Sequence, residues 1–464
     1  MNSLKFLFKK YKLEEVFTPS SYAKLTYVSR PSLEDDVEKF LKIPGMQIVL
    51  YGHSGCGKST MIYNILQKRR RGYISTSCTS STTFDELLYQ AFDKLNVFYK
   101  TEMSSSRSDS YAAELKLKNS ALSSMLSQTT IEGASEKQVR VLPLQLTPER
   151  LAQFLGEMKC VWVIEDFHKV AEKEKKRLAE VVKIFMDSAS TYPYVKIICL
   201  GAVTTANELV ALDNDLATRV AEIFIPLMLD IELSKVIETG FELLNLVYDK
   251  LLEDKIIYYS NNLAAVCHQL CFDICHSLSI ENSQIQRMHV NDDNFDSAVL
   301  SYLKKNSDTI KKPFDRIASN PRCVAILEGM INIQNETMTI GEILTETKKI
   351  INIHQEELLI LIEEMKKPEL GEVIRFDTNS KKYSFATPFF QAFLKMQIES
   401  EKMERNEQEN RRNRKDQYQL VRKPELFNAC EIIRGEEIEE YIQTLNSYFL
   451  RSQKLKEEFD LLQQ

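Results

Sequence analysis

The sequence contains few of the residues that interrupt helices, with 13 glycines and 12 prolines among 464 residues. A chain of this composition is expected to be rich in helix. Its nine cysteines include no CxxC pair, which predicts a reducing, cytoplasmic setting. No apolar run reaches the ~18 residues that a membrane-spanning helix needs. The first twelve residues interleave apolar and basic side chains and lack the apolar core of a secretion signal.

Excess charge of one sign is also scarce. The net charge of −6 gives no general nucleic-acid signature, so any contact with DNA or RNA must be local. The apolar fraction of 44% and the charged fraction of 27% are those of a soluble globular protein. A chain of this length is too long for one ordinary core. We therefore expect two or three domains and no association with a membrane.

The first half of the chain alternates short apolar runs with amphipathic patterns. The apolar runs read as buried strands, at 47–52, 72–77, 160–165, 195–201 and 222–226. Helical patterns separate them, at 58–67, 83–98, 171–188 and 205–211. This alternation predicts an α/β fold with a parallel sheet covered by helices on both faces. Residues 103–136 contain ten serines and little periodicity, which predicts a loop-rich insertion at about 103–140.

The second half has a different pattern. Residues 231–280 read as wholly helical, and three short helical patterns from 322 to 366 precede two short strands joined by a polar turn. Helix, helix, helix and hairpin is the order of a winged helix. We therefore divide the chain into five parts: an N-terminal segment (1–30), an α/β core (31–230), a helical lid (231–318), a winged-helix domain (319–396), and a charged connector with C-terminal helices (397–464).

One motif carries specific chemistry. The stretch Gly52–His53–Ser54–Gly55–Cys56–Gly57–Lys58–Ser59 matches GxxxxGK[ST] and lies between a predicted strand and a predicted helix. Glycines let backbone N–H groups surround a phosphate, and the helix N-terminus adds positive charge. Lys58 is expected to reach the β- and γ-phosphates of ATP, and Ser59 to hold Mg²⁺. Together with Thr60, these residues form the predicted site for ATP or ADP. The side chains of His53 and Cys56 are interpreted as having no specific role, because the loop binds phosphate through its backbone.

Two acids follow another predicted strand. In VWVIEDFH, four apolar residues precede Glu165 and Asp166, as expected where a buried strand emerges at the carboxyl edge of a sheet. Phosphate hydrolysis needs one acid to hold Mg²⁺ and one to activate water. The usual order in such enzymes is Asp and then Glu, whereas here Glu precedes Asp. The metal contact would then fall to Glu165 and the activation of water to Asp166, although the sequence does not determine which acid is the catalytic base. A shorter base reaches less far, which predicts slow turnover.

These features resemble the STAND and AAA+ branches of P-loop ATPases, and so imply an ASCE/AAA+-like core. KIICLGAVTTANEL is similar to a sensor-1 strand, which implies that Thr204 senses the γ-phosphate. DLATRVAEIFIP resembles the stretch of origin-recognition-like AAA+ proteins in which an arginine precedes the last core strand. The resemblance implies that Arg219 acts as an arginine finger on a neighbouring subunit. YVSRPSLEDDVEKFL is similar to the segment that precedes the phosphate loop in both groups.

Simpler interpretations stand beside these. Thr204 could cap the helix that follows it, Arg219 could be an ordinary surface or ion-paired arginine, and His168 could orient its neighbours or face solvent. Cysteines lie at i, i+4 and i+8 on one predicted helical face, at positions 267, 271 and 275, with histidines beside them. Close packing of small thiols explains this pattern better than a metal site, which needs about four converging ligands.

The resemblance implies a regulatory ATPase that acts as a nucleotide-dependent assembly switch. Such a protein would form a homo-oligomer and signal to a separate effector or partner protein, with a role in bacterial defence against phage. An alternative is a DNA-handling AAA+ protein, such as an initiator, helicase loader or transposition regulator. The third predicted helix after residue 320 carries four glutamates and two lysines, a charge balance that does not favour DNA. A protein that binds nucleotide without hydrolysing it is the third possibility.

Overall fold

The computed structural model describes residues 10–95, 146–202, 218–333, 335–378, 380–401 and 403. Residues 1–398 form one compact unit and residues 399–464 a second. Three sequence predictions lie outside the described residues: the serine-rich insertion at 103–140, the helix at 205–211 and the helices near the C-terminus.

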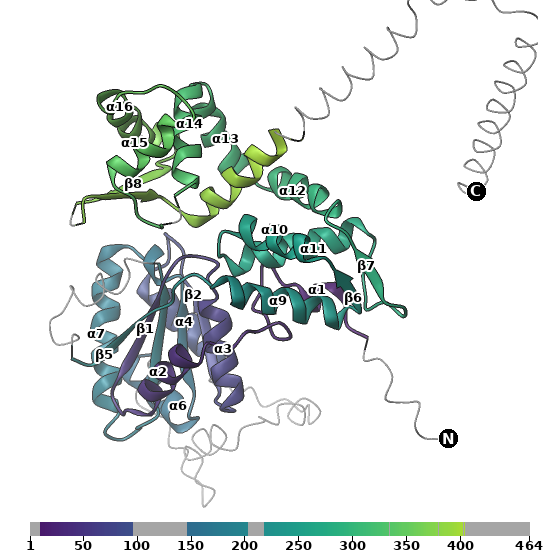
Figure 1. The fold of residues 1–464 in the computed structure, drawn as a ribbon. Helices are drawn as coiled ribbons and strands as arrows, with labels where there is room; N and C mark the ends of the chain where they lie inside the picture. Colours follow the sequence, from purple (N-terminus) through teal and green to yellow (C-terminus); the bar gives the residue numbers. More distant parts are fainter. Residues whose placement is uncertain are drawn as a thin grey trace, which may run out of the picture. The chain divides into compact units, whose positions relative to one another are not determined.

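A five-stranded parallel sheet lies at the centre of the α/β core (Figure 1). Its strand order is β2-β3-β4-β1-β5. The strands are β1 (Gln47–Tyr51), β2 (Tyr73–Ser77), β3 (Val161–Glu165), β4 (Lys196–Gly201) and β5 (Val220–Phe224). Each overlaps a predicted apolar run, although β5 begins and ends two residues before the predicted run at 222–226. Every pairing within the sheet is parallel. The predicted α/β class is therefore confirmed.

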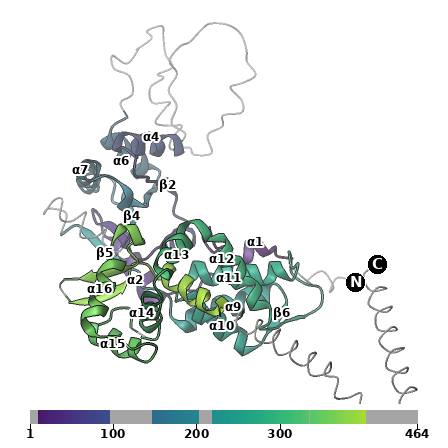
Figure 2. The same cartoon turned by 90° about the horizontal axis from the view of Figure 1, so that it is seen from above.

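Helices cover both faces of this sheet because strand residues alternate between them. Ile48 and Leu50 of β1 pack in one apolar cluster with α2 (Pro31–Lys42) and α3 (Lys58–Lys68), whereas Val49 packs in the other. The second cluster includes α4 (Phe84–Lys94), α6 (Pro148–Glu157) and α7 (Glu172–Ser188). In Figure 2 these three helices lie together on one side of the sheet, with α2 on the other.

Local sequence signals account for several helix starts. Thr83 caps α4 and forms a reciprocal capping box with Glu86. Thr147 caps α6 through the backbone N–H of Arg150, and Pro148 occupies the first helical position. These caps fix where the helices begin, and therefore which of their faces pack against the sheet.

The lid is helical but contains a small parallel ladder. Its helices are α9 (Asp230–Leu243), α10 (Lys250–Ser260), α11 (Ala264–Ser277), α12 (Asn294–Lys305) and α13 (Lys312–Ala318), with the short π-helix η3 (Ser307–Lys311) before α13. The prediction that 231–280 is wholly helical is wrong at β6 (Leu246–Tyr248), which pairs with β7 (Met288–Val290). A three-residue strand is too short to show alternation, and its partner lies about forty residues further along.

The following segment has the predicted order of three helices and a hairpin. It comprises α14 (Pro321–Ile331), α15 (Ile340–Lys348), α16 (Gln355–Met365), the short η4 (Pro368–Leu370), and the antiparallel strands β8 (Ile374–Asp377) and β9 (Lys382–Phe385). A further helix begins at Pro388. One apolar cluster joins this segment, the lid and α1 (Leu13–Val16). The winged-helix assignment and the domain boundaries stay predictions.

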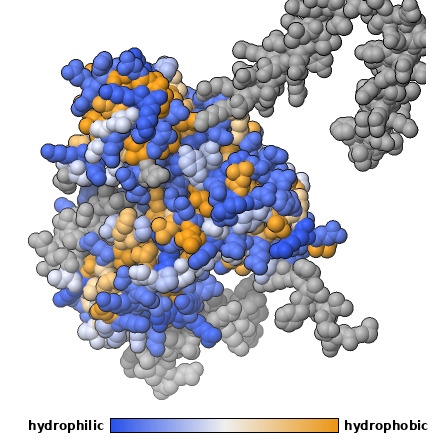
Figure 3. Space-filling model, in the orientation of Figure 1, coloured by the Kyte–Doolittle hydropathy of each residue, from blue (hydrophilic) through white to orange (hydrophobic). Residues whose placement is uncertain are grey.

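The face drawn in Figure 3 is mostly hydrophilic, with separate apolar patches. Within the described ranges, no helix combines the length and the apolar character that crossing a bilayer would require.

Candidate functional site

The phosphate loop, residues 52–57, connects β1 to α3. Gly57 directly precedes α3 and has a φ of 97°, a left-handed conformation that favours glycine. At Gly52, an added Cβ would lie 2.3 Å from the carbonyl oxygen of Ile225, which no side chain can tolerate. The backbone path therefore requires glycine at both positions. Because Gly52 and Gly57 have no side chains, an anion bound in the loop can approach the N-terminus of α3 at these two positions.

The other residues of the motif have distinct environments. Cys56 is buried in the apolar cluster shared with α3, so it packs rather than merely filling the loop. Ser54 is exposed and lines the cavity described below. Burial, more than any neighbouring charge, lowers the pKa of His53. Thr60 accepts a hydrogen bond through Oγ1 from the backbone N–H of Ala23 at 3.4 Å.

The Lys58 ammonium group lies inside the loop. Its Nζ donates to the carbonyl oxygens of Gly52 at 2.9 Å and His53 at 2.8 Å. Burial lowers the pKa of Lys58, and nearby Cys56 and Asp166 oppose that shift. The ammonium group is thus held where an anion bound in the loop would meet it, and a charged phosphate oxygen is a stronger acceptor than either carbonyl.

Glu165, the last residue of β3, faces the start of α3. Its Oε2 accepts a hydrogen bond from Ser59 Oγ at 3.2 Å. Its Oε1 accepts from Tyr63 Oη and, at 2.9 Å, from Ser75 Oγ. The carboxylate is therefore oriented by donors from three places: the first turn of α3, its second turn, and β2.

Asp166 follows Glu165 in a left-handed conformation, with φ 56° and ψ 33°. This conformation is uncommon for a residue other than glycine and redirects the chain at the carboxyl edge of the sheet. The side chain is half-exposed and forms an ion pair with Lys169 at 2.7 Å. The two acids therefore differ: Glu165 is held among hydroxyl groups, whereas Asp166 is open to solvent.

A cavity of about 780 Å³ lies over these groups. The phosphate loop, the two acids, residues of the segment 18–30 and three residues of α11 line it, together with Phe389. Its volume is in the range of small-molecule sites, roughly 300–1,000 Å³. It therefore joins the loop and the acids in a space large enough for a nucleotide.

The residues present fit a nucleotide with a divalent cation. The N-terminus of α3, which no side chain of Gly52 or Gly57 covers, and the ammonium group of Lys58 can both bind the negative charge of a polyphosphate. The hydroxyl of Ser59 beside the Glu165 carboxylate supplies the hard oxygen donors that Mg²⁺ prefers.

The lid contacts the phosphate loop directly. The backbone N–H of Ala265 donates to the carbonyl oxygen of Gly55 at 3.3 Å, and an added Cβ at Gly55 would lie 2.8 Å from the ring of Phe389. His268 of α11 lines the cavity and accepts a hydrogen bond through Nδ1 from Thr18 N at 3.0 Å. Burial lowers the pKa of His268 to about 4, which keeps it neutral for this contact.

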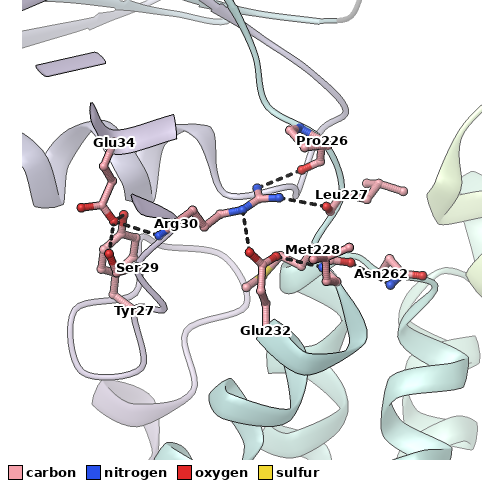
Figure 4. A network of polar contacts seen from close by, with 10 residues as sticks. Tyr27, Ser29, Arg30, Glu34, Pro226, Leu227, Met228, Glu232 and Asn262 are labelled. Carbon is pink, nitrogen blue, oxygen red and sulfur yellow. Dashed lines mark hydrogen bonds and ion pairs between the residues drawn. The ribbon is translucent and has the colours of Figure 1, made fainter. Parts of the chain in front are cut away.

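The residue Arg30 joins the core to the start of the lid (Figure 4). Its guanidinium donates to the carbonyl oxygens of Pro226 and Leu227, each at 3.0 Å, and forms a largely buried ion pair with Glu232 at 3.1 Å. Residues 225–229 connect β5 to α9, so Arg30 fixes the crossing from the sheet to the lid.

The same segment holds Glu34. The Oε1 atom of Glu34 accepts from Tyr27 Oη, Ser29 Oγ and the backbone N–H of Arg30, at 2.7, 2.6 and 3.0 Å (Figure 4). Burial by itself would raise the pKa of Glu34, but these hydrogen bonds outweigh it and hold the pKa below its ordinary value. The arginine and the first acid of the segment SRPSLE are thus both structural anchors.

Replacing Arg30 with alanine is expected to lower the free energy of unfolding by about 3 kcal/mol, because Glu232 would be left buried without its cation. Urea unfolding followed by circular dichroism measures this change. Lys12→Ala is a matched control, since the Lys12–Glu14 pair is exposed and should contribute under about 1 kcal/mol. Equal midpoints for the Arg30 variant and the parent would contradict the assignment.

The remaining predicted site residues have different outcomes. Thr204 lies outside the described residues. Arg219 immediately precedes β5, and its carbonyl accepts from Gln47 N at the start of β1. Because β1 and β5 are parallel, Arg219 lies at the edge of the sheet opposite to its own phosphate loop. Its side chain is exposed and pairs with Asp187 at 3.5 Å. His168 lines the cavity beside the acids.

The predicted face of cysteines is an apolar packing surface. Cys267, Cys271 and Cys275 of α11 are fully buried in the lid's apolar cluster. Burial raises the pKa of Cys275 to about 12, so its thiol stays protonated. This agrees with the packing interpretation.

Two contributors to the site were not predicted. Tyr63 and Ser75 both bond Glu165, although neither belongs to a motif. For Tyr63 a signal was present: it lies four residues after Ser59 on one helix, so both side chains share a face. The hydrogen bond from Ser75 to Glu165 forms because β2 is adjacent to β3, and the spacing of residues in the sequence does not determine which strands are adjacent.

Comparisons with known proteins agree with this geometry. Residues 45–199 match a family model described as an AAA domain. Among curated proteins, none is similar enough in sequence to be recognised as a relative.

Several solved structures also match this chain at low similarity. The Walker-type ATPase PABY2304 of Pyrococcus abyssi is 15% identical, with a TM-score of 0.46, over 80% of this chain and 96% of its own. The ORC2 protein of Aeropyrum pernix, solved in ADPNP–ADP complexes, is 11% identical, with a TM-score of 0.45, over 84% and 98%. Cdc6p of Pyrobaculum aerophilum is 11% identical, with a TM-score of 0.40, over 83% and 98%.

At these identities and TM-scores, nothing about activity, ligand or partner is carried over from those proteins. The structure itself shows a parallel sheet with a phosphate loop after β1 and two acids at the end of β3. The family model matches residues 45–199. Over these residues the chain is similar to AAA domains.

Proposed function

We propose that this protein binds ATP or ADP with Mg²⁺, hydrolyses ATP slowly, and uses the bound nucleotide as a switch for assembly. The observation that carries the proposal is the convergence of Lys58, Ser59 and Glu165 at one end of a cavity of about 780 Å³. A cation, a hydroxyl and a carboxylate in this arrangement suit the charge of a nucleotide polyphosphate and its metal ion.

The chain's own residues would divide the work as follows. Lys58 would exchange its two carbonyl acceptors for phosphate oxygens and so stabilise charge on them. Ser59 and Glu165 would hold Mg²⁺, which when bound neutralises charge on the phosphates. Asp166, which is solvent-accessible, would accept the proton of an attacking water. Asp166 is also engaged in an ion pair with Lys169 at 2.7 Å, and this competing contact supports slow turnover.

The contacts of the lid support a switch. The loop touches α11 through Ala265 and the segment after β9 through Phe389. A change in the loop on nucleotide exchange would therefore alter both contacts. Within the segment we propose as a winged helix, α16 carries four glutamates, one of which pairs with Arg322. This charge favours a protein partner over DNA.

Size-exclusion chromatography with ADP, ATP or a non-hydrolysable analogue, each with and without duplex DNA, tests the proposal. An ATP-dependent larger species without DNA is the expected result. A shift that requires DNA would favour the DNA-handling alternative. Nucleotide binding without turnover would reduce the function to a binding switch. The separate effector and the role in phage defence remain predictions that follow only from the first outcome.

Arg219 is proposed to act on the site of a neighbouring copy, because it lies away from its own loop and its side chain forms an exposed ion pair with Asp187. Arg219→Ala should keep nucleotide binding while its turnover falls to the level of the unassembled chain. Mixing Arg219→Ala with Asp166→Asn protein should restore turnover, because the Asp166 variant still binds nucleotide and supplies the arginine that the other copy lacks. If mixing restores nothing, Arg219 is an ordinary surface residue. Arg150→Ala, which replaces an exposed arginine of α6, is the control.

A further inference from the structure

The carboxylate of Glu165 has unequal partners at its two oxygens. Oε1 accepts two hydrogen bonds, from Tyr63 Oη and Ser75 Oγ, whereas Oε2 accepts one, from Ser59 Oγ. Tyr63 and Ser75 also lie 3.0 Å apart, oxygen to oxygen. Each hydroxyl has one proton, and an ionised carboxylate is a stronger acceptor than a neutral hydroxyl. Both protons are therefore directed to the same oxygen of Glu165.

We propose that Tyr63 and Ser75 are positioning residues that hold one oxygen of Glu165 so that the other faces the metal position beside Ser59. This inference rests on the proposed function. Both residues also line the cavity, but the role proposed for each is exerted through the carboxylate and not through a contact with the nucleotide or the metal ion. Partners of this kind orient metal-binding carboxylates in many proteins, and their loss typically weakens metal affinity or activity by about 10–100-fold.

Packing keeps the two donors in place. Tyr63 is buried on the inner face of α3, and its ring stacks on that of Tyr73 with centroids 4.9 Å apart. Ser75 lies in the middle of β2, which pairs with β3 along its whole length. The carboxylate is thus held by a helix and a strand that are themselves fixed.

Equilibrium binding of a fluorescent ATP analogue tests this, measured once in EDTA and once across a series of Mg²⁺ concentrations. Tyr63→Phe and Ser75→Ala should each bind the analogue normally in EDTA. Each should need about tenfold more Mg²⁺ than the parent for the Mg²⁺-dependent gain in affinity. Tyr302→Phe is the matched control, because it removes the hydroxyl of another buried tyrosine, in α12 of the lid, and should leave both measurements unchanged.

The outcomes separate this inference from the proposed function. Parent protein that binds no analogue, with or without Mg²⁺, overturns both. Parent protein that responds to Mg²⁺ while both variants follow the same Mg²⁺ curve overturns the positioning role alone. Variants that lose affinity equally in EDTA and in Mg²⁺ would show that Tyr63 and Ser75 support only the fold of the loop, which also overturns it.

Discussion

Lys58→Ala should abolish every nucleotide-dependent change in the protein and lower ATP turnover by about 10³-fold. The ammonium group is the sole side-chain cation that donates into the backbone of the loop among the described residues. Removing it deletes a preorganised charge at the point where negative charge develops during phosphate transfer. Losses of 10²–10³-fold are typical for one such donor.

The measurement is turnover together with chromatography in the presence of the non-hydrolysable analogue. Lys68→Ala offers a control ten residues further along the same helix, where the lysine is exposed and lies 3.9 Å from Glu34. That variant should behave as the parent does. If assembly with ATP survives the loss of Lys58, the phosphate site has been assigned to the wrong part of the chain.

Glu165→Gln and Asp166→Asn should separate metal binding from water activation. The first removes the charge next to Ser59, so Mg²⁺-dependent nucleotide binding should weaken by about 10–100-fold. The second leaves the Ser59–Glu165 contact intact, so binding should persist while turnover falls by about 10²-fold or more. Both substitutions keep the size of the side chain, which limits disturbance of the strand end.

Nucleotide affinity with and without Mg²⁺, compared with single-turnover rates, distinguishes the two roles. Glu149→Gln, an exposed acid in the first turn of α6, is the control. The opposite pattern, with binding lost in Asp166→Asn and turnover lost in Glu165→Gln, would exchange the roles. Full turnover in both variants would leave the acids with no part in catalysis.

Local patterns predicted the sheet well because each strand is signalled within its own residues. Five apolar runs became five parallel strands, and a loop motif of fixed spacing lies at the end of β1. The acids were predicted by the same logic, since Glu165 ends a run of four buried residues. Features set by neighbouring residues in the sequence are therefore accessible without a structure.

Contacts between distant segments could not be predicted in this way. The bonds from Arg30 to Pro226 and Leu227 join positions almost two hundred residues apart, and Ser75 reaches Glu165 only because β2 is adjacent to β3. The ladder of β6 and β7 was missed for the same reason. In each case the partner is determined by the topology, and no spacing in the sequence encodes it.

The ring of Phe389 against Gly55 has a practical consequence for dissecting this protein. A fragment that stopped at residue 318 would keep the whole ATPase motif set. It would also remove Phe389 from the loop and the partners of Asn261, which bonds Pro388 and Gln391. It would cut through the apolar cluster shared by the lid and the segment after it, exposing side chains that are now buried. Turnover measured on such a fragment would describe an enzyme with an uncovered loop, so activity should be compared only between full-length chains.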